Sequence, residues 1–271
     1  MRIVILTGRQ ANQKALCHKI ARVAEVAAIV VSDNAPRRRP ALAKRARLFL
    51  NRVGNRVAGR PFVDVWFRLL AEYEREYPQF PDAPLVPVRN VNDPATLDAL
   101  ARHAPDLTVV SGTNLVGKKT IGAAGPIVNL HTGISPYVKG GPNCTNWCLA
   151  RNWFHLIGNT VMWLDAGIDT GRIIATEQTP LDGSEDLFAL HRKVMDHAHD
   201  LYVRALARIA EGRAVPSVPQ DAIGEGALFY NADWNYAEMR RALKNFAAGY
   251  KNHFADRERL SRELKLVALD S

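Results

Sequence analysis

The chain has few cysteines and no long apolar run. Its 271 residues include three cysteines, and every apolar stretch falls short of the roughly 18 residues that a membrane-spanning helix needs. Three cysteines do not suggest the disulfide framework of a small secreted domain. The first residues, MRIVILTG, lack the long apolar core and the cleavage-like site of a signal peptide. The sequence therefore predicts no membrane span and a reducing, cytoplasmic setting.

The first turn lacks the glycine pattern of dinucleotide-binding proteins. Arg2–Thr7 is rich in β-branched residues, as a buried parallel strand is, and residues 12–24 carry apolar side chains at helical spacing. Only one glycine stands between them, so G-x-G-x-x-G is absent. Backbone N–H groups at a helix N-terminus still offer a place for a phosphate. A plain turn is the alternative to a substrate-binding turn formed by Gly8, Arg9, Gln10 and Asn12.

The excess of positive charge is local. The chain has 36 basic and 27 acidic residues, a net charge of +9. Nine basic residues in segment 34–60, which holds no acid, account for the whole excess: Arg37, Arg38, Arg39, Lys44, Arg45, Arg47, Arg52, Arg56 and Arg60. This segment is either a solvated insertion or a contact for an acidic acceptor, for tRNA or for an anionic membrane surface.

Strands and helices alternate through the first two thirds of the chain. Buried-type strands are expected at 26–31, 85–88, 107–111, 127–130 and 161–164, and helices at 61–77, 94–103 and 142–154. Asp93 is the expected N-cap of the helix at 94–103. This alternation predicts an α/β fold with a Rossmann-like, mostly parallel sheet flanked by helices.

The pattern changes after Pro180. We expect a long helix at 185–211 capped by Ser184, a short strand at 227–230, a helix at 236–246 and a charged, partly mobile tail. The sequence thus predicts a catalytic domain at 1–180, with the basic insertion 34–60, and a small helix-rich C-terminal region at 181–271.

The polar residues best suited to catalysis lie at the ends of two predicted strands. Asn129 and His131 are two positions apart, so a strand places both on one face. Asp165 and Asp169 follow the strand at 161–164. An amide, an imidazole and a carboxylate at strand ends are the parts of a polar catalytic centre. Taken singly, the histidine and the Asp-Thr-Gly turn have ordinary structural explanations.

The same stretch resembles a known family. N-L-H-x-G-x-S-P, followed by G-x-T-V-x-x-L-D-x-G-x-D-T-G-x-I-I, is similar to the folate-dependent formyltransferases that act on glycinamide ribonucleotide, methionyl-tRNA and amino-sugar nucleotides. The resemblance implies that Asn129, His131 and Asp169 are catalytic, whereas Asp165 matches a more variable position. It also implies that the folate pterin is held near Thr113, Leu115, Leu164 and Ala166.

The resemblance further implies formyl transfer from 10-formyltetrahydrofolate, as co-substrate and without a metal, to the amine of a small phosphorylated acceptor. An amino-sugar nucleotide fits best. Gln10 and Ala11 replace the Gly-Ser of the glycinamide ribonucleotide branch, and the C-terminal region has too few alternating strands for the barrel of the methionyl-tRNA branch. Both branches stay open as alternatives, as does a non-catalytic nucleotide- or RNA-binding protein. The oligomeric state is also open, with a homodimer among the options.

A zinc site is the weaker reading of the two clustered cysteines. Cys144 and Cys148 are four apart on a predicted helix, with His155 nearby, but a convincing fourth ligand is missing. Buried thiols are the commoner outcome. His191, His197 and His199 in the long predicted helix do not share one face suited to a metal.

Overall fold

Seven strands form one twisted sheet in the computed structural model, which describes residues 1–36, 59–141, 143–254 and 257–270. Its order is β3 (Leu85–Val88), β2 (Glu25–Ser32), β1 (Arg2–Gly8), β4 (Leu107–Ser111), β5 (Ile127–His131), β7 (Gly158–Trp163), β8 (Ile173–Gln178). The first five strands are parallel, and β7 and β8 run antiparallel to their neighbours. The predicted mostly parallel α/β sheet is confirmed. Residues 37–58 of the basic segment lie outside the described residues, so Arg60 is the one basic residue of the segment that the structure describes.

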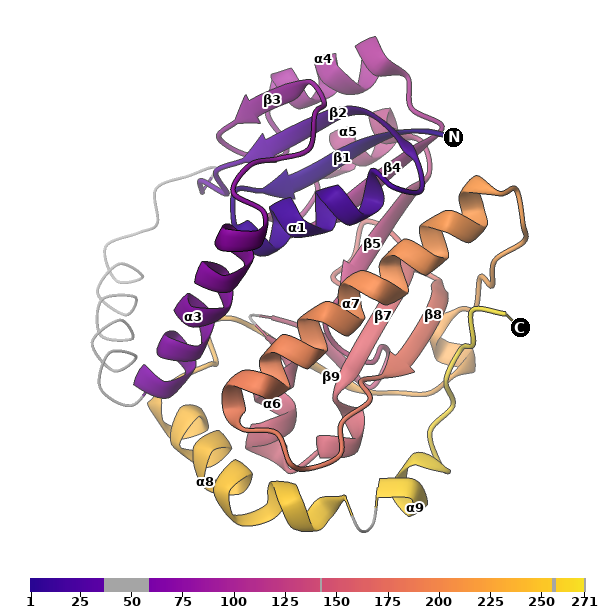
Figure 1. Cartoon of the computed structure of the whole chain (residues 1–271). Helices are drawn as coiled ribbons and strands as arrows, with labels where there is room; N and C mark the ends of the chain where they lie inside the picture. The colour runs from indigo at the N-terminus through magenta and orange to yellow at the C-terminus, as the bar shows by residue number, and fades with distance from the viewer. Residues whose placement is uncertain (37–58, 142, 255–256, 271) are drawn as a thin grey trace.

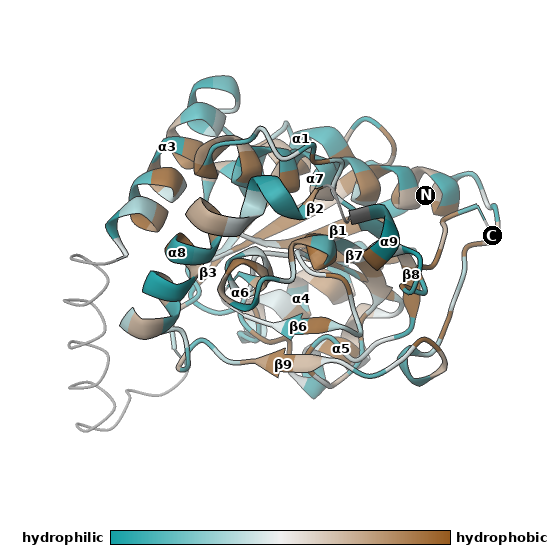
Figure 2. Cartoon of the chain, turned by 90° about the horizontal axis from the view of Figure 1, so that it is seen from below, coloured by the Kyte–Doolittle hydropathy of each residue, from teal (hydrophilic) through white to brown (hydrophobic). Residues whose placement is uncertain are grey.

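Helices cover both faces of the sheet. Alternate side chains of a strand point to opposite faces, so Ile3 and Ile5 pack under α1 (Ala11–Ile20) and α7 (Leu187–Ala210). Val4 and Leu6 pack on the other face, under α4 (Pro94–His103) and α5 (Lys118–Ala124). Figure 1 shows α1 and α7 in front of the strands, and Figure 2 shows apolar strands between helices with polar outer surfaces.

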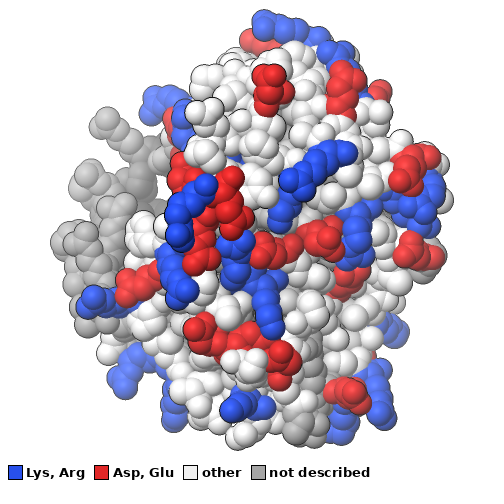
Figure 3. All heavy atoms as spheres, in the orientation of Figure 1, with Lys and Arg blue, Asp and Glu red and all other residues white. Residues whose placement is uncertain are grey.

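Helix α3 (Arg60–Glu76) lies against α1 and α7 through charged and aromatic contacts. Arg192 on α7 contacts Glu72 at 3.2 Å and Asp196 at 2.7 Å, and the hydroxyl of Tyr73 donates to Asp196 at 2.6 Å. The face shown in Figure 3 accordingly carries both signs of charge interspersed, without a broad basic patch on the described residues.

The C-terminal third packs beside the later strands. Trp147 of α6 (Cys144–Arg151) stacks on Phe229 with ring centroids 4.3 Å apart. Phe229 ends β9 (Ala227–Phe229), which pairs in parallel with β6 (Val138–Gly140). The remaining described elements are the 3₁₀ turns η1 (Phe154–Leu156) and η2 (Gln220–Ala222) and the helices α8 (Tyr236–His253) and α9 (Arg257–Ser261).

Four local expectations need correction. Asp186, not Ser184, caps α7, because its Oδ1 accepts from Ala189 N at 2.7 Å. Asp93 stands at the N-cap of α4, but its carboxylate accepts from Arg89 N and Asn90 N instead of the helix. The tail that was expected to be partly mobile packs onto β8. Val267 N donates to Thr176 Oγ1 at 2.7 Å, and Thr176 N donates to Val267 O at 2.9 Å. Strands β6 and β8 and helix α5 were not predicted.

The order of the strands fixes where a ligand can bind. The chain runs outward from β1 to β3 and then returns to place β4 on the other side of β1. Loops that leave neighbouring strands in opposite directions open a crevice at the carboxyl ends of those strands. The loops after β2 and β4 are held together at this end of the sheet, because Asn34 Nδ2 donates to Gly112 O at 2.9 Å and Asn114 N donates to Asn34 Oδ1 at 2.9 Å. Among the described helices, none has both the length and the apolar character needed to cross a bilayer.

Candidate active site

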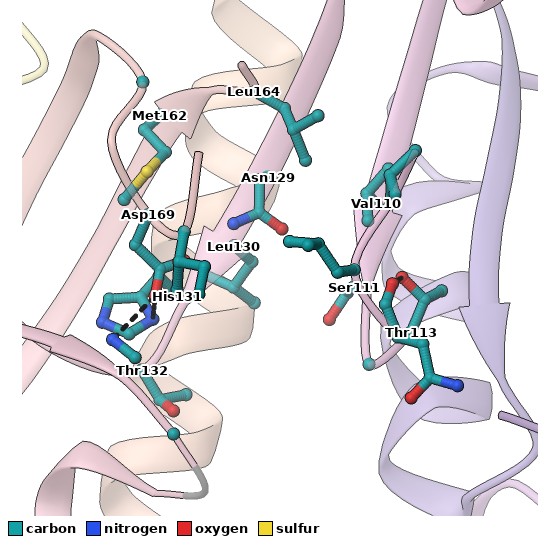
Figure 4. A pocket seen from close by; sticks show the side chains of 18 of the residues that line it. Val110, Ser111, Thr113, Asn129, Leu130, His131, Thr132, Met162, Leu164 and Asp169 are labelled. Atoms are coloured by element: carbon teal, nitrogen blue, oxygen red, sulfur yellow. Dashed lines mark hydrogen bonds and ion pairs between the residues drawn. The ribbon is translucent and has the colours of Figure 1, made fainter. Parts of the chain in front are cut away.

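A cavity of about 710 Å³ opens at this switch point. Its walls come from the turn after β1, the loop after β4, the end of β5, the β7–β8 loop and the segment after β9. A volume of this size suits one cofactor-sized ligand or two smaller ones. Figure 4 shows Asn129, His131 and Asp169 around this space, with Val110 and Leu164 as apolar neighbours.

Both ring nitrogens of His131 face oxygen acceptors. Nδ1 lies 3.3 Å from Asp169 Oδ2, and Nε2 lies 3.1 Å from the carbonyl oxygen of Val138. A neutral imidazole donates through one nitrogen only, whereas an imidazolium donates through both. The surroundings of the ring therefore favour its protonated form.

The electrostatics agree with this geometry. Burial alone lowers the pKa of His131, but the groups beside the ring, Cys144 and Asp169, raise it and bring the pKa of His131 to about 10. Burial in turn raises the pKa of the Cys144 thiol, which is neutral at pH 7 as a result. The lasting negative charge beside His131 is therefore the Asp169 carboxylate.

Asp169 is held in place through its side chain and its backbone. Gly140 N donates to its Oδ2 at 2.9 Å, and the Gln220 amide donates to its carbonyl oxygen at 2.8 Å. The residue has φ of +50°, a left-handed conformation that few non-glycine residues adopt. The loop closes tightly at Gly171, where a Cβ would lie 1.6 Å from the Trp163 carbonyl oxygen.

Asn129 sits beside His131 on β5 with a free amide. The register of the sheet places Asn129 opposite Met162 and His131 opposite Thr160 on β7. Among the described residues the Asn129 side chain has no hydrogen-bond partner, although it lines the cavity. An unoccupied amide next to an imidazolium offers one hydrogen-bond donor and a fixed positive charge, and both stabilise a developing oxyanion.

The predicted folate and substrate residues divide between those in the cavity and those outside it. Thr113, Leu115 and Leu164 line the cavity, as do Gln10 and Asn12. Ala166, Gly8 and Arg9 do not line it. Arg9 instead forms an ion pair with Asp33, and Gly8 contacts the loop after β4, where its Cβ would meet Gly112 O at 2.8 Å.

The two clustered cysteines face different partners. Cys144 Sγ lies 3.5 Å from His131 Nε2, and Cys148 Sγ lies 3.5 Å from the Leu156 carbonyl oxygen. Within the described residues, no three His, Cys, Asp or Glu side chains gather in a way that could hold a metal ion. Cys144 was predicted as a candidate zinc ligand, and the structure places it against the candidate catalytic histidine.

Sequence reasoning missed several cavity residues. His199 on α7 is fully buried, and neither ring nitrogen has a partner among the described residues. Asn12, which was predicted, is 2% exposed, and its Oδ1 atom is likewise unpartnered among the described residues. The missed residues that line the cavity are His199, Trp66 and, after β9, four consecutive residues: Phe229, Tyr230, Asn231 and Ala232. These residues are far apart in the sequence, so no local pattern indicates that they share one wall.

The described cavity wall is polar, and its cationic group is the protonated ring of His131. It includes the amide side chains of Gln10, Asn12, Gln13, Asn114, Asn129 and Asn231, and none of the described lining residues is Lys or Arg. Its carboxylates are Asp165 and Asp169. Amides beside aromatic side chains suit a ligand rich in hydroxyl groups more directly than they suit a bare phosphate.

Fold and site together define an α/β protein with an Asn, His and Asp centre at the switch point of a mostly parallel sheet. Residues 1–206 match the family model described as formyl transferase. The chain belongs to the formyl transferase family.

The sequence relatives are named methionyl-tRNA formyltransferases, whereas a structural neighbour is named a sugar N-formyltransferase. A methionyl-tRNA formyltransferase of Syntrophus aciditrophicus is 32% identical over 140 residues, 51% of this chain and 44% of that protein. Another from Chlorobium phaeovibrioides is 27% identical over 172 residues, 61% of this chain and 53% of that protein. The chain thus spans about half the length of these curated relatives. A sugar N-formyltransferase structure from Shewanella has a TM-score of 0.57 at 13% identity, with 90% of this chain and 88% of that chain covered. These structural likenesses establish the fold.

Proposed function

We propose that the protein transfers the formyl group of 10-formyltetrahydrofolate to the amine of a small acceptor, most favourably an amino-sugar nucleotide. The observation that carries the proposal is the Asn129 amide and the charged His131 ring beside the Asp169 carboxylate, in a cavity of the required size. In the reaction the acceptor nitrogen attacks the formyl carbon, and the bond from that carbon to N10 of the folate breaks. The acceptor loses one proton and the folate nitrogen gains one.

The charge that develops on the formyl oxygen needs fixed donors. Asn129 supplies one through its amide, and His131 as an imidazolium supplies a fixed positive charge. Asp169 stabilises the imidazolium and orients the ring. Because an imidazolium has no free lone pair on either nitrogen, the ring cannot accept the amine proton in this state. We assign that step to the Asp169 carboxylate, directly or through a water molecule.

The donor is proposed to bind along the loop after β4. Val110 and Leu164 give this end of the cavity apolar sides, and residues 111–116 and 164–165 line it. A flat ring with polar edges fits such a slot, since its faces need apolar contact and its edges need backbone donors and acceptors. Thr113, Leu115 and Leu164 are the residues proposed to surround the pterin, whereas Ala166, which was also expected there, lies outside the cavity.

The acceptor is proposed to occupy the opposite end, where unpartnered polar atoms gather. Asn12 Oδ1 can only accept a hydrogen bond, and a ring N–H of His199 can donate one. Burial lowers the pKa of His199 to about 3, so its ring is neutral and also offers an acceptor nitrogen. A sugar hydroxyl both donates and accepts, and it would satisfy the two residues at once. This complementarity supports an amino sugar as the acceptor.

The methionyl-tRNA alternative is favoured by one observation, the 32% identity to a methionyl-tRNA formyltransferase. A single assay separates the readings. Tetrahydrofolate release is measured with 10-formyltetrahydrofolate and, in turn, nucleotide-linked amino hexoses, glycinamide ribonucleotide and methionyl-tRNA. The expected result is turnover with an amino hexose that is lost in Asn129→Ala and His131→Ala. His191→Ala, a change of an equally buried histidine outside this cavity, should retain it. Turnover with methionyl-tRNA alone overturns the acceptor, and no turnover with any amine overturns the reaction.

A further inference from the structure

The strained backbone of Asp169 is fastened by a residue from the C-terminal third of the chain. Gln220 Nε2 donates to the carbonyl oxygens of both Asp169 and Gly171, at 2.8 Å each. Of the two ends of the Gln220 amide, only the NH₂ group can donate hydrogen bonds to two carbonyl oxygens, so the orientation of the side chain follows from its partners. Its own Oε1 has no partner among the described residues, and the residue is 9% exposed.

The turn that carries Gln220 is itself anchored to the sheet. Val218 and Ile173, the first residue of β8, exchange two backbone hydrogen bonds of 2.8 and 2.9 Å. Ile223 packs against Ile173 in a small apolar cluster on the other side of the turn. The turn that carries Gln220 is therefore anchored on both sides. As a result, the two hydrogen bonds of Gln220 fix the position of the Asp169 loop.

The same segment supports the other contact of Asp169. Gly140 N, which donates to the carboxylate, lies at the end of β6. Strand β9 pairs with β6, and Gly141 N donates to Phe229 O at 3.1 Å. A Cβ at Gly140 would lie 2.0 Å from Phe229 O, so the two strands are in tight contact there. Residues 218–229 thus hold the backbone of Asp169 directly and its carboxylate through Gly140.

We propose that Gln220 is a positioning residue for the proposed reaction: it fixes the Asp169 carboxylate against His131. This inference rests on the proposed function for its effect on turnover, but the geometric claim stands separately. Asp169 from the β7–β8 loop and Cys144 from α6 are the titratable side chains that act on His131 most strongly. If the Asp169 loop loses its anchor, the interaction of His131 with Asp169 changes and its interaction with Cys144 does not.

The test compares Gln220→Leu and Gln220→Glu with Gln178→Leu in the full chain. Leucine removes the donor at nearly constant volume, and a glutamate carboxylate can only accept. Both changes therefore leave the carbonyl oxygens of Asp169 and Gly171 without this hydrogen-bond donor. Gln178 is the matched control, because its Nε2 also donates to two oxygens, His155 O at 2.6 Å and Ser261 Oγ at 2.8 Å, away from Asp169. Thermal unfolding of each variant measures how much stability is lost when a glutamine that donates to two oxygens is replaced.

The deciding measurement is the titration of the His131 ring by NMR in the absence of any ligand. We expect both Gln220 variants to lower the pKa of His131 by about one unit or more, and Gln178→Leu to leave it at the wild-type value. Formyl transfer should show about a 10- to 100-fold fall in kcat with little change in KM for the folate. A wild-type His131 titration in both Gln220 variants overturns the positioning role.

The two proposals can fail separately. If no amine is formylated but the His131 pKa falls in the Gln220 variants, the positioning of Asp169 stands and the proposed function does not. If turnover is found and both Gln220 variants match Gln178→Leu in kcat and in the His131 titration, the function stands and the positioning role is overturned.

Discussion

His131 Nδ1 lies 3.3 Å from Asp169 Oδ2, while Nε2 of the same ring faces the Val138 carbonyl oxygen at 3.1 Å. The ring is thus placed between a carboxylate and a carbonyl, and it satisfies both only when it carries two protons. This arrangement makes His131 a hydrogen-bond donor and electrostatic partner in the resting protein. It also separates the roles of the three candidate catalytic residues, since the proton acceptor must then lie elsewhere.

The first prediction concerns the charge on His131. Asp169→Asn removes the carboxylate and should lower the pKa of His131 from about 10 by at least one unit, because the nearest lasting negative charge is gone. NMR titration of the ring measures this directly. Formyl transfer should fall on the order of 10²-fold or more in the same variant. An unchanged His131 titration in Asp169→Asn would show that Asp169 is not the cause of the raised pKa.

The second prediction follows from the same pKa by linkage. The folded protein binds a proton at His131 with a pKa of about 10, whereas the unfolded chain binds it near 6.5. The folded state therefore holds more protons between these values, and its stability from this group is complete below about pH 6.5 and declines as pH rises toward 10. Urea unfolding at pH 7 and pH 9.5 should show a smaller decline in His131→Gln than in wild type. Equal declines would contradict the assignment.

The third prediction concerns the glycine beside the His131 ring. A Cβ at Gly133 would lie 2.5 Å from His131 Nε2 and 2.8 Å from Val138 O. Gly133→Ala should therefore displace the ring and lower kcat by about 10²-fold, as small misplacements of reacting groups do. Gly122→Ala is the control, since a Cβ there meets nothing within 4 Å. It lies in α5 and should leave kcat unchanged and the fold slightly more stable. Wild-type turnover in Gly133→Ala would argue against the placement of His131.

The fourth prediction concerns acid stability. Burial lowers the pKa of His191 to about 4 and that of His199 to about 3. The unfolded chain binds their protons at pH values where the folded chain does not, so stability falls as pH drops from about 6.5 toward 4. Each histidine should contribute about 2 kcal/mol to the loss between pH 7 and pH 5. Denaturant unfolding at the two pH values should show that loss reduced in His191→Leu; a loss equal to that of wild type would count against a neutral buried His191.

The fifth prediction concerns the junction of β4 and β5. The buried hydroxyl of Tyr202 donates to Val128 O at 2.6 Å and accepts from Val110 N at 3.2 Å. Tyr202→Phe removes a buried partner from both strands and should lower the free energy of unfolding by about 1 to 3 kcal/mol. Tyr77→Phe is the control, because Tyr77 is only half-buried and its ring lies beside that of His18, away from both strands. Equal stabilities of the two variants would show that the Tyr202 hydroxyl contributes nothing.

Local pattern was sufficient for the layered fold. The β-branched runs of β1, β2, β4 and β5, together with apolar residues at helical spacing after β1, indicate buried parallel strands with crossover helices. Strand β6 has only three residues, and β8 was not separated from the turn before it. Short elements of this kind have too few residues for a period to show, and their pairing partners are distant in the chain.

The sequence by itself determined which residues are candidates for chemistry and the class of fold that presents them, because strand periodicity and the Asn129, His131 and Asp169 motif are local properties. Only the tertiary structure decided what surrounds them. It placed Cys144 and Val138 at the second nitrogen of His131, Gln220 behind Asp169 and His199 in the cavity wall. The physical reason is that burial and the approach of distant side chains set the protonation state of a histidine and the position of a carboxylate, and neither is encoded in the neighbouring residues.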